Sequence, residues 1–353
     1  MNVTTIGLDI AKNVFQVHGI DCHGKIVLQK KLSRGKMLDF FGKLTPCLVG
    51  MEACGGAHYW ARELEKQGHT AKLMPAQYVK PYVKGNKTDN NDAAAICEAL
   101  TRPHMRFVSI NTTAQQDLQM LHRIRSRLVA SRTTLINQIR GLCGEYGLVF
   151  RPGPAHARQG LAGVLERNAC GLSTLACELL ADLQGQLREL DQRIDAYDAR
   201  VKQACASDPR AAKLVALPGI GALGATALVA AVNDGKQFVR ARQMAASLGL
   251  TPHEHSSGGK QRLMGMSKRG NPYLRMLLIH GARSALRYAP GKTDRLLLWA
   301  LAVQTRRGPN VAAVALANKL ARISWAVLAR DRVYQADRTA RTAVAYRLGQ
   351  TVQ

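Results

Sequence analysis

The chain has 353 residues, 46% of them hydrophobic, which is enough for two or three domains with packed cores. Its 50 Lys and Arg residues against 24 Asp and Glu give a formal net charge of +26, which predicts a polyanionic partner, most often nucleic acid. The first residues lack a secretory signal pattern and the eight cysteines form no CxxC pair, so the sequence disfavours secreted, disulfide-rich and zinc-binding classes. We expect a cytoplasmic protein with reduced thiols.

The first hundred residues predict a mixed α/β unit. Three short runs rich in β-formers, VTTIGLDI, VFQVHGID and KIVLQKKL, are separated by tight turns and indicate an antiparallel meander. They are followed by a helical run (35–44), an apolar strand (47–53), a helix (56–68), a second strand (70–76) and a helix that begins at Asp89. Three antiparallel strands followed by α/β crossovers is the element order of the RNase H-like fold.

The middle of the chain predicts long helices. Between 112 and 147 apolar residues keep near-heptad spacing with basic residues interleaved, and Gly and Pro at 152–154 mark a break. A stronger 4-3-4-3-4 spacing follows and is typical of a coiled-coil seam. The seam consists of Leu183, Leu187, Leu190, Ile194, Tyr197 and Val201. Two interpretations stay open: the seam closes a helix hairpin within the core, or it joins copies of the chain in a homo-oligomer.

The last third predicts a mainly α-helical domain. The stretch LVALPGIGALGATALVAAV places a Pro-Gly-x-Gly turn between two apolar helices, which is typical of a helix-hairpin-helix. Gly219 and Gly221 then bring backbone NH groups toward a DNA phosphate, or form a purely structural turn. A dinucleotide-binding interpretation is disfavoured because Pro218 abuts the first glycine and no βαβ unit surrounds it. Asn318, Lys319 and Arg322 interrupt the apolar stretch 311–330, which predicts a core helix and no membrane span.

These patterns predict three domains. They are an α/β catalytic domain (1–155), a coiled-coil segment (156–208) and a helical domain (209–353). From 245 to the end the sequence carries 18 basic and 4 acidic residues, so we expect this part to make the main electrostatic contact with nucleic acid. The basic last twenty residues of the chain, 334–353, are either a mobile tail or a nucleic-acid contact.

Four acids in the first domain form a candidate metal site. Asp9 and Glu52 each follow an apolar strand, where a charged group is costly unless it is paired or binds a cation. Asp89 and Asp92 stand three apart, so a helix presents both on one face, although either Thr88 or Asp89 could also cap that helix. Oxygen-rich sites favour Mg²⁺ or Mn²⁺, and two such ions can activate an attacking oxygen and stabilise a leaving one at a phosphodiester.

The stretch HEHSSGGKQRLMGMSKRGNPYLR in the last domain is a glycine-rich basic block. Its cations suit a phosphate backbone, and the alternative is a solvated basic loop that contacts DNA without chemistry. A metal site at 253–255 is disfavoured because adjacent residues of an extended segment point to opposite faces. The candidate nucleic-acid ligands in the block are Lys260, Arg262, Lys268, Arg269 and Arg275.

The chain resembles a known family in several of these blocks. GLDIAK, GMEACGGAHYWA and NKTDNNDAAAI are similar to the DEDD motifs of insertion-sequence transposases related to the Piv DNA invertases, whose first domain resembles the RuvC junction resolvase. LPGIGALGATAL and SLGLTPHEHSSGGKQRLMGMSKRGNPYLRMLL are similar to the family's C-terminal transposase domain. Asp9, Glu52, Asp89 and Asp92 take the places of the four acids, and Ser257 takes the place of the serine, next to Ser256 and ten residues before Ser267.

The resemblance implies a DNA transposase or site-specific recombinase of a bacterial insertion sequence. It implies a serine nucleophile that joins DNA covalently, a site shared between protomers of a dimer or a synaptic tetramer, and a noncoding bridge RNA that pairs with donor and target DNA. The cytoplasmic protein would be associated with the nucleoid. Two alternatives remain: a metal-dependent nuclease resembling a Holliday-junction resolvase, without a covalent intermediate, and a nonenzymatic nucleic-acid-binding assembly protein.

Overall fold

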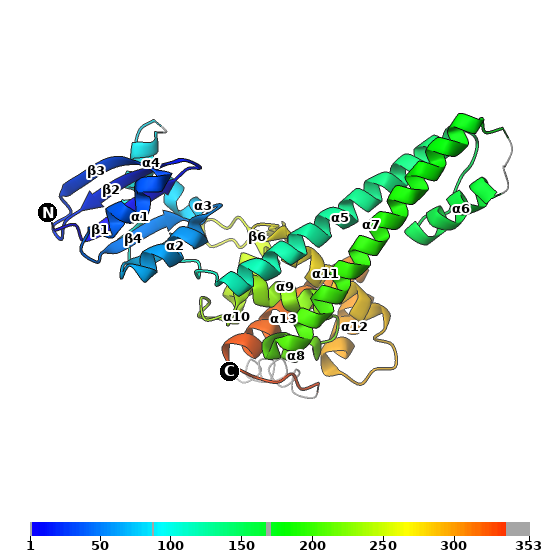
Figure 1. Cartoon of the computed structure of the whole chain (residues 1–353). Coiled ribbons are helices and arrows are strands. Elements are labelled where there is room, and N and C mark those ends of the chain that lie inside the picture. Colours follow the sequence, from blue (N-terminus) through cyan, green and yellow to red (C-terminus); the bar gives the residue numbers. More distant parts are fainter. Residues whose placement is uncertain (1, 87, 167–170, 337–353) are drawn as a thin grey trace, which may run out of the picture. The chain divides into compact units, whose positions relative to one another are not determined.

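The chain forms two compact units, Met1–Thr112 and Thr113–Gln353, in the computed structural model (Figure 1). The structure describes residues 2–86, 88–166 and 171–336, so Cys170 and most of the basic end of the chain, 337–353, lie outside the described residues. Helix α5 (Thr113–Glu145) packs against helices of the second unit and belongs to that unit. The predicted first domain, 1–155, therefore runs past the end of the first unit.

The first unit is a five-stranded sheet with helices on both faces. Its strands lie in the order β3-β2-β1-β4-β5, with β1, β2 and β3 antiparallel and with β4 and β5 parallel to β1. The predicted order of strands and helices is confirmed, and it is compatible with an RNase H-like fold. The strands are β1 (Thr5–Ile10), β2 (Val14–Ile20), β3 (Ile26–Ser33), β4 (Leu48–Glu52) and β5 (Thr70–Met74). The helices are α1 (Met37–Phe41), α2 (Ala57–Lys66), α3 (Ala76–Val79) and α4 (Asp89–Leu100), with short 3₁₀ turns at Arg34–Lys36 and Lys80–Tyr82.

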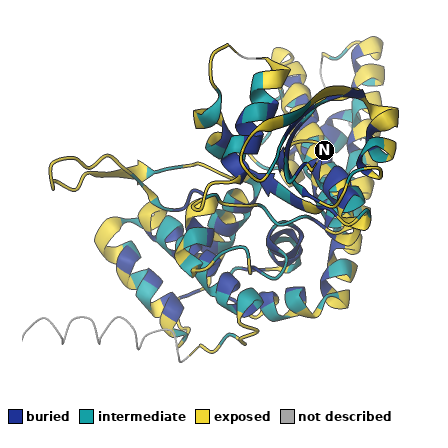
Figure 2. Cartoon of the chain, turned by 90° about the vertical axis from the view of Figure 1, so that its left-hand side faces the viewer, coloured by how far each residue is buried: buried dark blue, intermediate teal, exposed yellow. Residues whose placement is uncertain are grey.

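Alternation along the strands divides the core of this unit into two layers. Ile6 and Leu8 of β1 are fully buried with Phe41 of α1 and Trp60 of α2. Residues of opposite parity, such as Gly7, face α4 on the other side of the sheet. Figure 2 shows the strands beside the N-terminus carrying buried residues in dark blue, whereas much of the outer helix surface is exposed.

The second unit is mainly helical. Its helices are α5, α6 (Pro154–Glu166), α7 (Thr174–Ser207), α8 (Pro209–Val215), α9 (Ala222–Val232), α10 (Ala241–Ser247), α11 (Pro272–Arg287), α12 (Arg295–Arg307) and α13 (Pro309–Ala329). A two-stranded hairpin, β6 (Pro252–Glu254) and β7 (Leu263–Met266), lies between α10 and α11. The sequence predicted only a flexible basic loop at this place.

The seam on α7 packs against α5 within the chain (Figure 1). Leu187, Ile194 and Val201 are each no more than 3% exposed. Asp191 of α7 accepts hydrogen bonds from Arg132 of α5 (3.2 Å) and from Arg158 of α6 (2.5 Å), which ties the three helices together. This packing corresponds to the helix-hairpin interpretation of the seam, and the buried half of the seam is therefore not available for contacts between copies.

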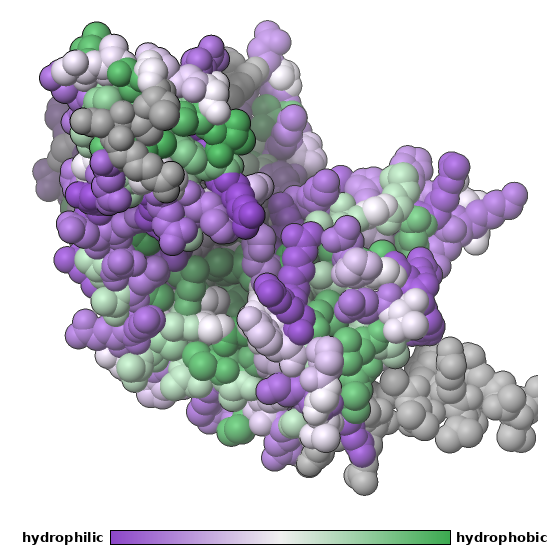
Figure 3. Space-filling view, turned by 90° about the vertical axis from the view of Figure 1, so that its right-hand side faces the viewer, coloured by the Kyte–Doolittle hydropathy of each residue, from purple (hydrophilic) through white to green (hydrophobic). Residues whose placement is uncertain are grey.

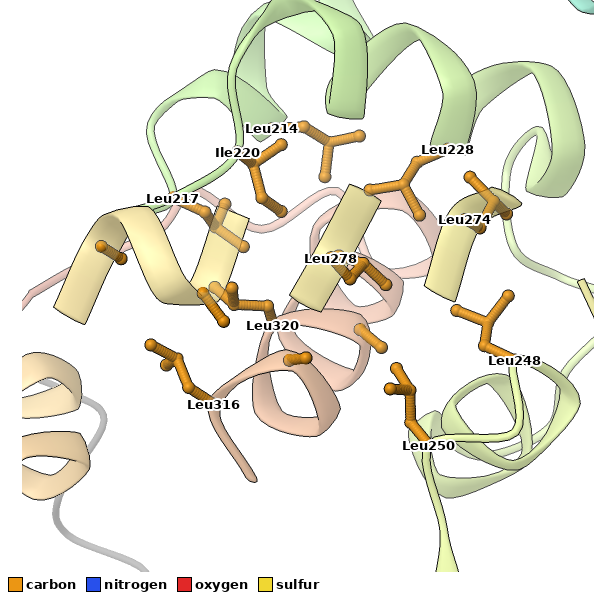
Figure 4. Packing of buried hydrophobic residues seen from close by; sticks show 14 of the residues in the cluster. Leu214, Leu217, Ile220, Leu228, Leu248, Leu250, Leu274, Leu278, Leu316 and Leu320 are labelled. Atoms are coloured by element: carbon orange, nitrogen blue, oxygen red, sulfur yellow. The ribbon is translucent and has the colours of Figure 1, made fainter. Parts of the chain in front are cut away.

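Leucines and alanines of the helices that follow form the largest core. Leu214, Leu228, Leu278 and Leu320 come from four different helices and meet there (Figure 4). Among the described helices, α13 is the one long and apolar enough to cross a membrane by composition. Because Leu316 and its neighbours along α13 are packed in this core, we interpret α13 as a core helix.

A buried polar chain joins α5 to α9 and α11. The Thr226 hydroxyl donates to the Ala222 carbonyl at 2.7 Å, so its oxygen accepts from Nε2–H of His122 at 3.0 Å. The other ring nitrogen, Nδ1, then accepts from the Tyr273 hydroxyl at 3.0 Å. Burial lowers the pKa of His122 to about 4, so the ring is neutral near pH 7 and this pattern of donors and acceptors is the stable one.

Candidate active site and nucleic-acid interface

Asp9 and Glu52 lie at the carboxyl ends of two neighbouring parallel strands. The register of β1 and β4 pairs Leu8 with Met51, so the two acids occupy the next position on each strand. Both side chains share a face with the glycine two residues earlier in their strand, and those glycines, Gly7 and Gly50, face α4. The sequence prediction that both acids stand at strand ends is confirmed.

The glycines beside these acids let α4 lie directly on the sheet. A Cβ at Gly7 would stand 2.1 Å from the carbonyl oxygen of Ala93, and one at Gly50 would stand 2.8 Å from Leu100. Small residues beside two acids could also leave room for a bulky ligand, but helix α4 fills the space beside Gly7 and Gly50. Gly55, after Glu52, does have open space around it.

Thr88, and not Asp89, caps α4. Its hydroxyl accepts a hydrogen bond from the backbone NH of Asn91 at 3.2 Å, and its carbonyl accepts from the NH of Asp92 at 2.9 Å. Asp89 is therefore the first helical residue and Asp92 the fourth, both in the first turn of α4. Asp89 is exposed and Asp92 is half-buried, and the capping bond is made by Thr88 in place of either carboxylate.

The first turn of α4 lies at the same end of the sheet as Asp9. Gln16, which pairs with Asp9 across β1 and β2, donates to Asn90 of α4 at 3.5 Å. Within the described residues, however, no group of three or more His, Cys, Asp or Glu side chains is close enough to hold a metal ion. Carboxylate oxygens are the ligands that Mg²⁺ prefers, so the donor chemistry fits a hard divalent cation.

Cys54 lies two residues after Glu52, at the same edge of the sheet. Desolvation raises the pKa of its thiol, and the negative charges of Glu52 and Asp9 raise it further. Both carboxylates therefore lie near enough to the Cys54 thiol to act on its pKa. No sequence signal beyond the proximity of Cys54 to Glu52 indicated this.

Ser257 lies beside the tip of the β6–β7 hairpin. Its carbonyl accepts a hydrogen bond from the NH of Lys260 at 3.0 Å, and Gly258 and Gly259 between them have φ of +56° and +74°. Two positive φ values in a two-residue loop are the signature of a hairpin turn that favours Gly-Gly. The letters SGGK carried this signal in the sequence.

The cations of the basic block fall into two groups. Lys260 and Arg262 are exposed on the hairpin, and Lys268 and Arg269 are exposed in the segment that returns to α11. Arg275, in contrast, is half-buried and donates to the carbonyl oxygens of Leu248 and Arg269, both at 3.0 Å. Arg275 therefore holds the base of the hairpin in place, and this structural role was not foreseen.

The two glycines of the α8–α9 turn differ in their surroundings. A Cβ at Gly219, whose φ is +87°, would stand 2.4 Å from the carbonyl oxygen of Gly281 in α11. Gly219 is thus required for close packing of the turn against α11. Gly221 is exposed at the start of α9, with nothing within 4 Å of a Cβ built there. Gly219 therefore has the purely structural role in the turn, and a contact with a DNA phosphate remains a prediction for Gly221.

Comparisons with known proteins identify the family. Residues 6–147 match the DEDD transposase family of IS110 type, and residues 211–296 match the family described as transposase IS116/IS110/IS902. The chain belongs to the IS110 family of insertion-sequence transposases. It is 50% identical to a probable family 20 transposase of Pseudomonas aeruginosa over 336 residues, which cover 95% of the chain and 99% of that protein. It is 45% identical to the transposase for insertion sequence element IS1111A of Coxiella burnetii over 95% of the chain and 92% of that protein.

The two family matches cover both candidate regions. The four acids fall within the DEDD match, and Ser257 and the basic block fall within the second match. The protein is therefore an enzyme, a transposase that acts on DNA.

Proposed function

We propose that this transposase cuts and rejoins DNA with a carboxylate-bound divalent ion, Mg²⁺ or Mn²⁺, and with Ser257 as the nucleophile. The observation that supports it best is the alignment of Asp9 and Glu52 on neighbouring parallel strands, with the first turn of α4 at the same end of the sheet. When bound, the ion would supply charge stabilisation at the phosphate. Asp9 and Glu52 would hold it, with Asp92 and Asp89 contributing from α4.

The proposed chemical step is a transesterification. The oxygen of Ser257 forms a bond to phosphorus as its proton leaves, the bond between phosphorus and the leaving strand's oxygen breaks, and that oxygen takes up a proton. The number of phosphodiester bonds stays constant, so the covalent intermediate can be rejoined to a second strand. Lys260 and Arg262, both exposed on the same hairpin, would stabilise the charge of the pentavalent phosphate.

The partners we propose are donor DNA, target DNA and a noncoding bridge RNA from the element, bound in the cytoplasm near the nucleoid. The net charge of +26 supports simultaneous binding of more than one duplex.

For the homo-oligomer, we propose exposed apolar residues at the end of α7 as contacts: Leu175 and Leu179, one helical turn apart, are 63% and 57% exposed. Figure 3 shows hydrophobic side chains in green among the hydrophilic surface at the end of the second unit where α6 and α7 lie.

Trapping of a covalent protein–DNA adduct tests the nucleophile. Wild-type transposase, co-purified with its RNA and given donor and target DNA with Mg²⁺, should yield an adduct that survives denaturant, and Ser257→Ala should yield none. An adduct that persists in Ser257→Ala contradicts the assignment. Cleavage without any adduct in wild type would favour the alternative, a metal-dependent nuclease in which water attacks. Asp9→Asn should bind DNA and yield neither product.

A further inference from the structure

The β6–β7 hairpin has two chemically different faces. Its pairing keeps one register from Glu254–Leu263, through the hydrogen bond from the NH of His255 to the carbonyl of Arg262 (2.9 Å), to the isolated bridge Ser257–Lys260. Residues directly opposite each other in an antiparallel pair project on the same side. Ser257 therefore shares one face with Lys260 and with the His255–Arg262 pair, and Glu254 and Ser256 share the other.

The hydroxyl of Ser256 joins the two strands of the hairpin. It donates to Oε1 of Glu254 at 2.7 Å and accepts from the backbone NH of Arg262 at 3.1 Å. One side chain thus contacts its own strand through Glu254 and the opposite strand through the backbone of Arg262. Within the described residues, the hydroxyl of Ser257 has no such bond, so it is the hydroxyl left for an external phosphate.

The Ser256 bridge acts between the Gly-Gly turn at the tip and Arg275 at the base, which also hold the hairpin. Residues 254–265 are all exposed, so no core holds the strands together. A short two-stranded hairpin in water is marginally stable, and a slip of one residue moves every side chain to the opposite face. Such a slip would turn Ser257 away from the face that carries Lys260 and Arg262.

We propose that Ser256 is a positioning residue, which with Glu254 locks the hairpin register and so keeps the Ser257 hydroxyl on the cationic face. The proposal rests on the proposed function, in which Ser257 is the nucleophile. It also separates the roles of the two adjacent serines: Ser256 fixes the register of the hairpin, and Ser257 attacks the phosphate.

The test measures hairpin order and chemistry separately in the full-length protein with its RNA. In Ser256→Ala, amide hydrogen exchange at Lys260 and Arg262 should become faster, and adduct formation at saturating DNA should slow by about ten- to a hundredfold, because a small misplacement of a reacting group has an effect of this size. The Kd for DNA should stay within about twofold, since the phosphate ligands remain. Ser256→Thr, which keeps the hydroxyl, should restore both the exchange rates and the adduct rate.

Two further variants sharpen the result. Glu254→Gln keeps an acceptor oxygen for Ser256 but cannot act as a base, so it should behave nearly as wild type, whereas Glu254→Ala should resemble Ser256→Ala. Gln261→Ala, opposite Ser256 on the same face, is the matched control and should change neither the exchange nor the adduct rate.

The outcomes distinguish this proposal from the proposed function. If Ser257→Ala forms no adduct and Ser256→Ala matches wild type in exchange and rate, the positioning role is wrong and the nucleophile assignment stands. If Ser256→Ala abolishes the adduct and Ser257→Ala keeps it, Ser256 is the nucleophile and both proposals fail. If wild type forms no adduct, the proposed function fails, and hydrogen exchange in Ser256→Ala still decides the hairpin lock.

Discussion

Gly7 is the single residue that most directly sets the position of α4. A Cβ at this position would lie 2.1 Å from a backbone oxygen of α4, and backbone cannot move aside as a flexible side chain can. We expect Gly7→Ala to destabilise the first unit by about 3 kcal/mol, the upper range for overpacking, and to abolish DNA cleavage by displacing Asp92. Thermal unfolding and a cleavage assay measure the two effects. Gly35→Ala, where a Cβ meets nothing within 4 Å, is the control, and equal effects of the two substitutions would contradict this role.

His122 makes the stability of the second unit depend on pH. The pKa of this residue is about 4 in the folded protein and near its ordinary value of 6.5 in the unfolded chain. Between these values the unfolded state holds more protons, so stability is full above pH 6.5 and falls as the pH is lowered toward 4. We expect the wild type to lose about 2 kcal/mol more between pH 7 and pH 5 than His122→Gln does. Urea unfolding of both proteins at the two pH values measures this difference; equal losses would mean that His122 can be protonated without unfolding.

At the scale of elements, the cap of α4 connects helix stability to the candidate site. Removing the Thr88 hydroxyl leaves the NH of Asn91 without its acceptor, so Thr88→Ala should destabilise the first unit by about 1 kcal/mol. It should also lower the cleavage rate, because Asp89 and Asp92 lie in the turn that frays. Thr88→Ser keeps the acceptor and should restore both properties. A slower rate in Thr88→Ala with unchanged melting would instead point to a direct role of the hydroxyl.

The strands and helices that carry the acids could be predicted because their signals are local. Apolar runs that end at Asp9 and Glu52, and a cap followed by an alanine-rich helix, depend only on neighbouring residues. The close packing of Gly7 and Gly50 against α4 could not be predicted, since it depends on a helix that lies across the sheet and comes much later in the sequence. The hairpin was missed for a different reason: its polar strands lack the apolar alternation that marks a strand, and only its Gly-Gly turn indicated it.

At the scale of the molecule, helical periodicity does not by itself give the division of the chain into compact units. The first unit ends at Thr112, although helical periodicity begins there and continues across the predicted boundary at 155. Periodicity shows which residues are helical but not which helices they pack against. The seam on α7 illustrates this point: the same heptad spacing serves a hairpin or an oligomer, and the contact with α5 could be established only from the fold.

The two units carry different halves of the proposed active site, and this leads to a prediction for the oligomer. Asp9 and Glu52 belong to the first unit and Ser257 to the second. If each working site combines acids from one protomer with the serine of another, then Asp9→Asn and Ser257→Ala proteins are each inactive alone. In a mixed dimer, one site would contain both substitutions and the other would contain neither.

We therefore expect a mixture of the two inactive proteins, co-expressed with the RNA, to recover strand exchange to about a quarter of the wild-type level, because half of randomly formed dimers are mixed and each has one intact site. Recombination of donor and target plasmids measures the recovery. The control is the double variant, Asp9→Asn with Ser257→Ala, mixed with Asp9→Asn, which offers no intact pair in any arrangement. No recovery in the first mixture, once mixed oligomers are demonstrated with two affinity tags, would place the acids and the serine of each site in the same protomer.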